Sequence, residues 1–244
     1  MSAKQKSAAM HMVPAHIALI PDGNRRWSSA HKARLLDGYS LGIKKFIDFS
    51  VWLKSFGVKT LTVWALSLEN INRRKNTELN VLYSLYIRAA YDKEILKKLD
   101  NCKARVKIIG MKELLPPKVR EALESVEKRT SKYDKFTINL LVAYSGRADL
   151  VQAIKNTVAS TSSYACAIAD IQEDAIRRNL MTAELPDADL IIRTSGEKRL
   201  SGFLPWQSTY SELYFAKKCW PDFQKEDLRR ALHEFSSRHR RFGK

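Results

Sequence analysis

Two short segments of the 244-residue chain have the composition of phosphate-binding loops. Residues 22–27 read DGNRRW and residues 193–201 read RTSGEKRLS, so each combines a glycine with two arginines and other polar side chains. Glycine lets the backbone approach phosphate oxygens, N–H groups at a helix start favour anions, and arginine binds phosphate through two hydrogen bonds. Asp22 adds a carboxylate that could hold Mg²⁺, which prefers hard oxygen ligands. Two such loops indicate a reaction between two diphosphates.

An ordinary turn is the alternative for the first segment, because Asp-Gly and Gly-Asn are common turn dipeptides. Two further polar segments strengthen the case for a shared site. Ser67, Asn70 and Arg73 follow another apolar run, although by themselves they are more typical of a helix cap and a solvated face. Residues 144–147, YSGR, follow a third apolar run and again contain a glycine and an arginine.

The elements that must position these loops are predicted from apolar runs. Six short runs are mostly apolar on both faces and rich in β-branched or aromatic residues, as buried parallel strands are. They are His16–Ile20, Thr60–Leu66, Arg105–Ile109, Phe136–Ala143, Asp189–Arg193 and Glu212–Ala216. Helical patterns lie between them, which predicts an α/β fold with a six-stranded, mainly parallel sheet flanked by helices. Ligands of such sheets bind beyond the carboxyl ends of the strands, where the polar loops begin.

Four amphipathic patterns predict helices that pack on this sheet. Apolar side chains recur at helical spacing in three of them, and two prolines precede the fourth, as is common where a helix begins. The patterns are Ile43, Phe46, Ile47 and Val51; Leu79, Leu82, Leu85 and Tyr86; Leu228, Ala231, Leu232 and Phe235; and Val119–Arg129 after Pro116 and Pro117.

The composition excludes several classes of protein. A hydrophobic share of 45% excludes a disordered chain, and no apolar run approaches the roughly 18 residues that a spanning helix needs. Three scattered cysteines indicate a reducing, cytoplasmic setting rather than a disulfide framework or a zinc site. The net charge of +17 points to anionic partners such as nucleic acid, phosphorylated metabolites or an acidic membrane surface. We expect residues 1–12 to form a flexible tail and residues 13–244 a single domain.

The polar segments, in their order along the chain, resemble the cis-prenyltransferases, the family typified by undecaprenyl diphosphate synthase. The likeness rests on HIALIPDGNRRW at 16–27, SLENINR at 67–73, YSGR at 144–147, RTSGEKRLS at 193–201 and LPWQSTYSELYF at 204–215. It continues to Arg241-Phe242-Gly243 near the end of the chain. Five ordered blocks are far more specific than a single short motif. The Asp-Asp-x-x-Asp pairs of the all-helical trans-prenyltransferases are absent from the sequence.

The resemblance implies a homodimer with a parallel sheet and a hydrophobic tunnel that houses a growing prenyl chain. It implies Mg²⁺-dependent condensation of isopentenyl diphosphate with an allylic prenyl diphosphate, each addition making a cis double bond. The segment Asn72–Asp100 contains no insertion relative to the bacterial type member, so the expected product is a medium-chain polyprenyl diphosphate.

The resemblance also implies roles for individual residues. Asp22 and Asn24 would be catalytic, and Asp22 and Glu212 would serve the metal. The first diphosphate would lie against residues 23–26 and the isopentenyl diphosphate against the second arginine-containing segment. The implied substrate-binding residues are Gly23, Arg25, Arg26, Trp27, Arg34, Tyr39, Ser67, Asn70, Arg73, Arg193, Arg199 and Ser201.

The chain departs from the family pattern at four positions. Tyr39 stands where the family usually has histidine, and Leu35, with Arg34 beside it, stands where an arginine is common. Ile71 replaces a usual tryptophan and Arg74 a usual proline. These departures leave the substrate pair open, because some relatives join two allylic diphosphates in a branched, non-head-to-tail fashion.

Two other classes of function remain as alternatives. A nucleic-acid-binding protein would explain the positive charge, but it should show a basic stripe with stacking aromatics, whereas here the arginines gather after the strands. A non-catalytic subunit of a hetero-oligomer typically lacks the Asp-Gly-Asn motif, which this chain keeps. The basic excess is better assigned to peripheral contact with an anionic membrane.

Overall fold

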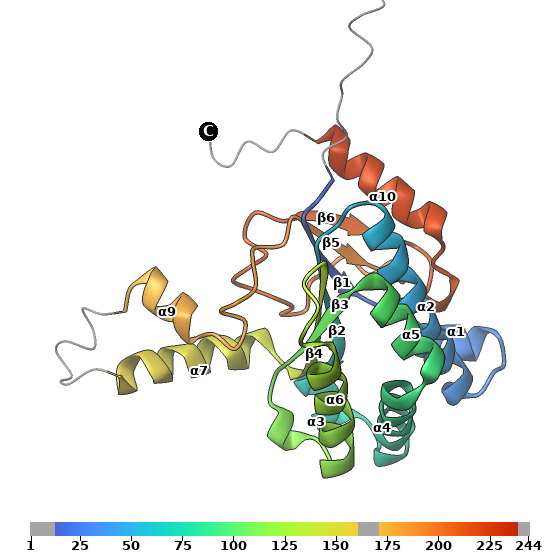
Figure 1. Ribbon diagram of the computed structural model, residues 1–244, viewed down its shortest axis with the longest axis horizontal. Coiled ribbons are helices and arrows are strands. Elements are labelled where there is room, and N and C mark those ends of the chain that lie inside the picture. Colours follow the sequence, from blue (N-terminus) through green and yellow to red (C-terminus); the bar gives the residue numbers. More distant parts are fainter. Residues whose placement is uncertain (1–12, 161–170, 239–244) are drawn as a thin grey trace, which may run out of the picture.

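The computed structural model describes residues 13–160 and 171–238 (Figure 1). The expected flexible tail, residues 1–12, lies outside these ranges. Six strands form one sheet in the order β3-β4-β2-β1-β5-β6, and every neighbouring pair is parallel. The strands are β1 (His16–Ile20), β2 (Thr60–Ser67), β3 (Ala104–Ile109), β4 (Phe136–Tyr144), β5 (Leu190–Arg193) and β6 (Glu212–Phe215). The predicted α/β fold with a six-stranded parallel sheet is therefore confirmed.

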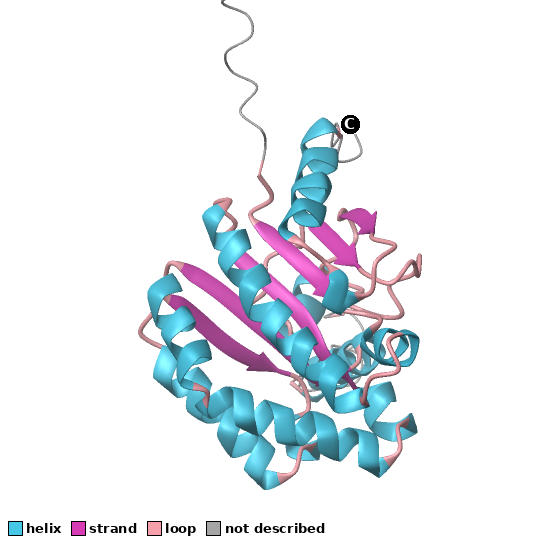
Figure 2. Cartoon of the chain, turned by 90° about the vertical axis from the view of Figure 1, so that its right-hand side faces the viewer, coloured by secondary structure: helices cyan, strands magenta, loops and turns pink. Residues whose placement is uncertain are grey.

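Helices connect the strands and flank the sheet (Figures 1 and 2). They are α1 (Asn24–Ala30), α2 (Leu35–Ser55), α3 (Leu68–Arg73), α4 (Asn76–Tyr91), α5 (Lys93–Cys102), α6 (Pro117–Thr130), α7 (Gly146–Ala159), α9 (Glu173–Asn179) and α10 (Lys225–Ser237). Two short 3₁₀ turns, η2 (Lys112–Leu114) and η3 (Trp220–Asp222), complete the described elements. Pro117 occupies the first position of α6, where its missing N–H costs no hydrogen bond.

Alternation along β1 divides the core into two layers, because successive strand residues point to opposite faces of a sheet. Ile17 and Leu19 pack in the larger cluster, which also contains buried side chains of α2, α4, α5, α6 and α10. Ala18 and Ile20 pack in the smaller cluster with Leu185 and other side chains of the segment between α9 and β6. Helices thus cover one face, and that largely irregular segment covers much of the other.

The register of the sheet brings the ends of several strands to one edge. Ile20 at the end of β1 lies beside Arg193 at the end of β5, and Ser67 at the end of β2 lies beside Tyr144 at the end of β4. The loops that follow these four strands therefore meet, as the sequence predicts.

An arm made of α7 and α9 projects from the body of the protein (Figure 1). Val151 and Ile154 on α7 expose 52% and 42% of their surface. Among the described residues, no helix is long and apolar enough to cross a membrane.

Candidate active site

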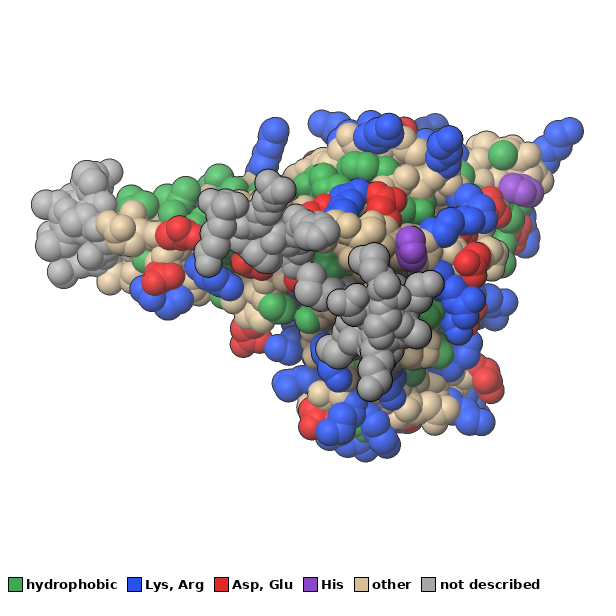
Figure 3. Space-filling view, turned by 90° about the horizontal axis from the view of Figure 1, so that it is seen from above, with side chains coloured by type: hydrophobic (Ala, Val, Ile, Leu, Met, Phe, Trp, Pro, Cys, Tyr) green, Lys and Arg blue, Asp and Glu red, His purple; other side chains and the backbone are tan. Residues whose placement is uncertain are grey.

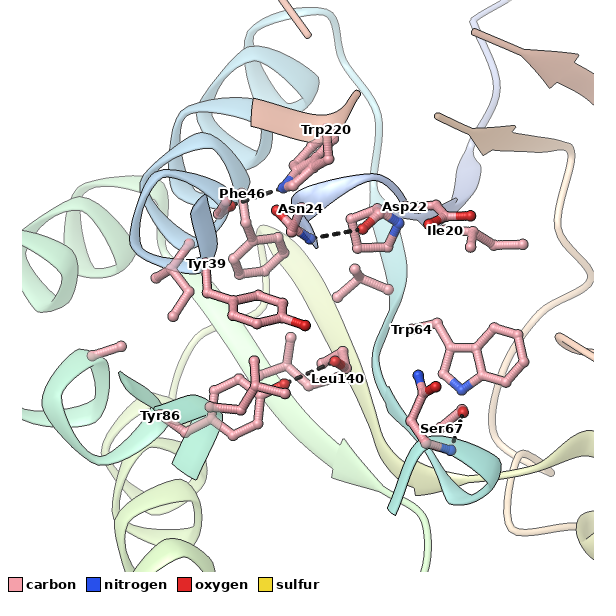
Figure 4. Close-up of a pocket in the computed structure, with 18 of the residues that line it drawn as sticks. Ile20, Asp22, Asn24, Tyr39, Phe46, Trp64, Ser67, Tyr86, Leu140 and Trp220 are labelled. Atoms are coloured by element: carbon pink, nitrogen blue, oxygen red, sulfur yellow. Dashed lines mark hydrogen bonds between the residues drawn. The ribbon is translucent and has the colours of Figure 1, made fainter. Parts of the chain in front are cut away.

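A pocket of about 830 Å³ opens where the loops after β1, β2 and β5 meet (Figure 4). Its polar part contains most of the side chains that the sequence analysis selected. These are Asp22, Gly23, Asn24, Arg25, Arg26, Tyr39, Ser67, Asn70, Arg73, Arg193, Arg199 and Ser201. The structure thus gathers four separate segments of the chain around one cavity.

Asp22 lies between two arginines from different loops. Nη2 of Arg193 donates to Oδ2 of Asp22 at 2.8 Å, and Nη2 of Arg26 lies 3.4 Å from the same oxygen. Partial burial raises the pKa of Asp22, but hydrogen bonding to Arg193 and the charges of both arginines outweigh this effect. The net shift lowers the pKa of Asp22, so the carboxylate is ionised at neutral pH.

The two arginine-containing loops are bound to one another. Arg26 donates from Nη1 to the backbone oxygen of Ser195 and to Glu197, both at 3.1 Å. Arg193 is buried and also donates to the hydroxyl of Ser201 at 3.0 Å. Arg193 therefore contacts both predicted phosphate sites, and the two diphosphates would lie side by side.

Gly23 is required by the close approach of neighbouring segments. Its φ is +104°, and a Cβ atom there would lie 2.9 Å from Sγ of Cys219 and from Cβ of Ser195. Any other residue would strain the backbone and separate the two loops.

Asn24 is held by one end of its amide only. Its Nδ2 donates to the carbonyl of Pro21 at 3.1 Å, whereas its Oδ1 is buried and makes no hydrogen bond within the described part of the chain. Gly42 leaves the space for this oxygen, because a Cβ on Gly42 would lie 2.4 Å from it. A buried, unsatisfied amide oxygen in a pocket is a ready acceptor for a donor group that a ligand or its water supplies.

The loop after β2 is shaped by a helix cap. The Ser67 hydroxyl accepts a hydrogen bond from the backbone N–H of Asn70 at 3.0 Å and so begins α3. Asn70 and Arg73 then line the pocket from α3. The capping role that the sequence favoured for Ser67 is present, and it positions the other two polar residues.

Two residues at this edge of the pocket, Arg74 and its partner Glu78, were not selected from the sequence as site residues. Glu78 accepts a hydrogen bond from the hydroxyl of Tyr39 at 2.7 Å and lies 3.1 Å from Nε of Arg74. Arg74 lines the pocket, while Glu78 lies behind it. The i,i+4 spacing of an arginine and a glutamate was the signal that could have identified the pair. Burial raises the pKa of the Tyr39 hydroxyl, which therefore stays protonated.

Three predicted site residues lie away from this pocket. Trp27 donates to Asp222 at 2.8 Å and stacks on His31, and Arg34 pairs with Asp37 at 3.0 Å at the start of α2. Neither residue lines the pocket. The motif that contains Trp27 indicated a site but not the direction of this side chain, and Arg34 was expected there only because it lies beside Leu35, where the family commonly has an arginine.

Glu212, the second expected metal residue, is the third of these. It pairs in register with Leu190, whereas Phe215 pairs with Arg193, so Glu212 lies at the amino end of β6. Three residues of strand separate it from the level of Arg193, about 10 Å at 3.3 Å per residue. Its carboxylate is bound to Arg238. Within one chain, the structure does not bring Glu212 to Asp22.

The donor set fits Mg²⁺ that arrives together with a substrate. Within residues 13–160 and 171–238, no group of three or more His, Cys, Asp or Glu side chains could hold a metal by itself. Mg²⁺ commonly binds one or two carboxylates together with substrate phosphates. Asp22 offers one ionised carboxylate beside guanidinium groups that can take those phosphates, which suits this mode of binding.

The remainder of the pocket is apolar. This part of the pocket lies between the sheet and the helices that cover one of its faces. Its lining comes from the helices α2, α4, α5 and α6 and from the strands β2, β3 and β4. The side chains are Ile43, Phe46, Ile47, Val63, Leu82, Tyr86, Ala89, Ala90, Ile95, Leu96, Leu99, Val106, Ile108, Leu123, Val126, Ile138 and Leu140. Charged and apolar parts thus share one cavity.

Comparisons with known proteins agree with this site. Residues 20–243 match the model of the undecaprenyl diphosphate synthase family of prenyltransferases. The chain is 40% identical over 233 residues to a geranylgeranyl-diphosphate-specific tritrans,polycis-undecaprenyl-diphosphate synthase of Pyrococcus horikoshii, covering 96% of this chain and 88% of the relative. It is 39% identical to an isoprenyl transferase of Thermus thermophilus, covering 95% and 89%.

Two solved structures resemble the fold closely. Lavandulyl diphosphate synthase from Lavandula x intermedia, in complex with dimethylallyl diphosphate, has a TM-score of 0.88 and 32% identity, with 95% of this chain and 99% of that chain covered. A probable undecaprenyl diphosphate synthase from Campylobacter jejuni has a TM-score of 0.76 and 30% identity, with the same coverage. The chain belongs to the undecaprenyl diphosphate synthase family of prenyltransferases, and it is a transferase of isoprenoid biosynthesis.

Proposed function

We propose that the protein is a Mg²⁺-dependent cis-prenyltransferase that condenses isopentenyl diphosphate with an allylic prenyl diphosphate and makes a medium-chain polyprenyl diphosphate. One observation carries the proposal: a single cavity joins the Asp22–Arg193 cluster to a long apolar lining. A prenyl diphosphate has the same two parts, an anionic head and an apolar chain.

The charged part suits the chemistry of this condensation. Breaking the allylic C–O bond leaves negative charge on the departing diphosphate, and cations fixed near its oxygens lower the barrier. Arg25 and Arg26 are placed to bind that diphosphate, while Mg²⁺, when bound at Asp22, would neutralise part of its charge. Arg193, Arg199 and Ser201 are placed to hold isopentenyl diphosphate beside it. No nucleophilic side chain is needed.

The apolar part is the proposed tunnel for the growing chain. The whole pocket, charged and apolar parts together, has a volume of about 830 Å³, near the upper end of the roughly 300–1,000 Å³ typical of ligand pockets. Tyr86 lies in this part, with its hydroxyl bound to the carbonyl of Ala65 at 2.8 Å, so that its ring rather than a free polar group faces the cavity (Figure 4).

The relatives support two choices of substrate pair. The relative from Pyrococcus horikoshii is specific for geranylgeranyl diphosphate, which favours that allylic diphosphate with isopentenyl diphosphate as its partner. The structure with the TM-score of 0.88 is a lavandulyl diphosphate synthase that contains dimethylallyl diphosphate, which is itself allylic. Such a diphosphate could serve either as the partner of isopentenyl diphosphate or in the second candidate, branched coupling of two allylic diphosphates.

Product analysis separates the two candidates. The purified protein is incubated with Mg²⁺ and with dimethylallyl, geranyl, farnesyl or geranylgeranyl diphosphate, each with and without isopentenyl diphosphate. Mass spectrometry should show polyprenyl products only where isopentenyl diphosphate is present. Products formed from an allylic diphosphate alone would establish branched coupling, and inactivity with every pair would refute both candidates.

Three further features of the protein follow as proposals. Exposed apolar side chains on α7 suit a homodimer formed through the projecting arm, where Figure 3 shows a group of hydrophobic side chains. Sedimentation velocity at micromolar concentration would show a monomer if this is wrong.

The free thiols of Cys102 and Cys219 suit a cytoplasmic location. The charge of +17 suits peripheral contact with anionic membranes, and liposome co-sedimentation that is insensitive to lipid charge would contradict it.

A further inference from the structure

A charged cluster joins four helices at the edge of the pocket. Arg25 comes from α1, Tyr39 from α2, and Arg74 and Glu78 from the end of α3 and the first turns of α4. The Glu78 carboxylate lies 3.1 Å from Nε of Arg74 and 3.6 Å from Nη1 of Arg25. The Tyr39 hydroxyl donates to Glu78 at 2.7 Å and accepts from Nη1 of Arg74 at 3.0 Å. Two positions where the chain departs from its family, 39 and 74, are thus in direct contact.

The charges of this cluster do not cancel. Two guanidinium groups share one carboxylate, which leaves an excess of one positive charge. Arg25 and Arg74 line the pocket, whereas Glu78 does not. Within the described part of the chain, Nη2 of Arg74 makes no hydrogen bond, so this group keeps donors for a ligand.

The two arginines differ in how strongly their neighbours fix their side chains. The side chain of Arg74 is 17% exposed and lies over the ring of Tyr39, with 5.8 Å between the guanidinium carbon and the ring centroid. The side chain of Arg25 is 63% exposed, and among residues 13–160 and 171–238 its one ion pair is the longer contact with Glu78. Arg74 is therefore fixed in place before any ligand binds, while Arg25 can leave Glu78 at little cost.

We propose that Arg74 is an additional ligand of the diphosphate that lies against the first arginine-containing loop, and that Tyr39 and Glu78 are its positioning residues. Glu78 holds Arg74 and Arg25 at the pocket edge, and it also competes with the diphosphate for both cations. The proposal rests on the proposed function, because it assigns one more contact to the allylic diphosphate of that reaction. Tyr39 is neutral and stands where the family usually has histidine. The proposal also explains how a positive charge is nevertheless present at this edge of the pocket.

Titration calorimetry with two probes tests the proposal without turnover. The probes are inorganic pyrophosphate with Mg²⁺, and farnesyl S-thiolodiphosphate, an analogue that ionises very slowly. Arg74→Gln should weaken binding of both probes on the order of 10-fold, as expected for the loss of a hydrogen bond to a charged group. Glu78→Gln should tighten binding by roughly 3- to 10-fold, because it removes a competing charge and keeps the shape.

Tyr39→Phe tests the positioning role. It keeps the ring and removes only the hydroxyl, so we expect it to weaken binding less than Arg74→Gln does. Combining it with Arg74→Gln should add nothing, because both changes remove the same contact. Arg88→Gln is the matched control. Arg88 is an exposed cation on the same helix α4 and does not line this pocket, so this variant should bind the probes as the unchanged protein does.

Three results would overturn the proposal. Binding by Arg74→Gln within about twofold of the unchanged protein would remove Arg74 from the diphosphate site. Weaker binding by Glu78→Gln would contradict the competition between the Glu78 carboxylate and the diphosphate. An equal loss in Arg88→Gln would reveal a general charge effect. If Arg74→Gln fails to fold, Arg74→Lys, which keeps the charge, together with Glu78→Gln decides the question. Failure of the unchanged protein to make any polyprenyl product would refute the proposed function but leave these binding results interpretable.

Discussion

Asp22 is the residue on which the proposed chemistry depends most. Its carboxylate faces the pocket, and Arg193 and Arg26 keep its pKa low. Asp22→Asn keeps the shape and removes the charge, so we expect folding to persist and turnover to fall on the order of 10²–10³-fold or more. Steady-state kinetics with Mg²⁺ measures this. Asp37→Asn, which changes a carboxylate outside the pocket, should retain turnover; near-normal turnover of Asp22→Asn would exclude the metal role.

Arg193 is expected to act mainly in binding. Arg193→Ala should raise KM for isopentenyl diphosphate more than it lowers kcat, because a phosphate contact made in both ground and transition states acts as uniform binding. It also removes the main partner of Asp22, so the pKa of Asp22 should rise. Kinetics with each substrate varied in turn measures the effect, with the exposed Arg105→Ala as control. A change confined to the allylic substrate would reverse the assignment of the two phosphate sites.

For single residues, the sequence predicted which residues gather at the site better than it predicted the direction in which each side chain points. The polar segments around Asp22, Ser67 and Arg193 do meet in one cavity, because all follow parallel strands that end at one edge. Trp27 belongs to the first of these segments and still points away from the pocket, towards Asp222. The Tyr39–Glu78 contact could not be predicted, because it depends on how α2 and α4 lie relative to one another.

At the scale of elements, the predicted strands agree with the structure to within one or two residues at each end. The reason is that most residues on both faces of β1, β2, β4 and β5 are buried, so each appears in the sequence as a nearly continuous apolar run. The edge strands β3 and β6 are partly exposed. The buried face of α2 was predicted less accurately. Val51 belongs to the predicted apolar pattern of α2 but is exposed, whereas Phe49, outside that pattern, is fully buried against Trp220 and Phe223. The 21-residue length of α2 lets its buried face drift relative to any short repeat.

A buried histidine joins strands of the sheet and should make its stability depend on pH. Nδ1 of His16 lies 2.9 Å from the carbonyl of Pro186 and must donate to it, so Nε2, 2.8 Å from Oγ1 of Thr62, accepts from that hydroxyl. Burial lowers the pKa of His16, and the carbonyl hydrogen bonds only partly oppose this. A lowered folded-state pKa means that His16 contributes stability above its unfolded-state pKa of about 6.5, and that this is lost as pH falls towards the folded-state value.

Urea unfolding at pH 7.5 and pH 5.5 measures this contribution. The free energy of unfolding should fall on acidification, and His16→Gln should lose less than the unchanged protein over the same range. His31→Gln, a change at an exposed histidine, should behave as the unchanged protein does. Equal losses in all three proteins would show that His16 does not carry the pH dependence.

For the whole molecule, the apolar part of the pocket is expected to set product length. Ala89 of α4 lines this part, and a larger side chain there would fill space that the chain should occupy. Ala89→Phe should therefore shift products towards shorter chains while the first addition continues. Ser84→Phe adds the same ring at an exposed position of α4 and is the matched control. Mass spectra with unchanged lengths for Ala89→Phe would place the growing chain elsewhere.

The central claim is that isopentenyl units are added one after another at the Asp22–Arg193 cluster. The most direct test supplies geranylgeranyl diphosphate and deuterium-labelled isopentenyl diphosphate to the purified protein and follows the products by mass spectrometry. The account predicts a series of chains, each one labelled five-carbon unit longer than the last, ending at medium length and absent from Asp22→Asn. Unlabelled products, or the same labelled series from Asp22→Asn, would contradict it.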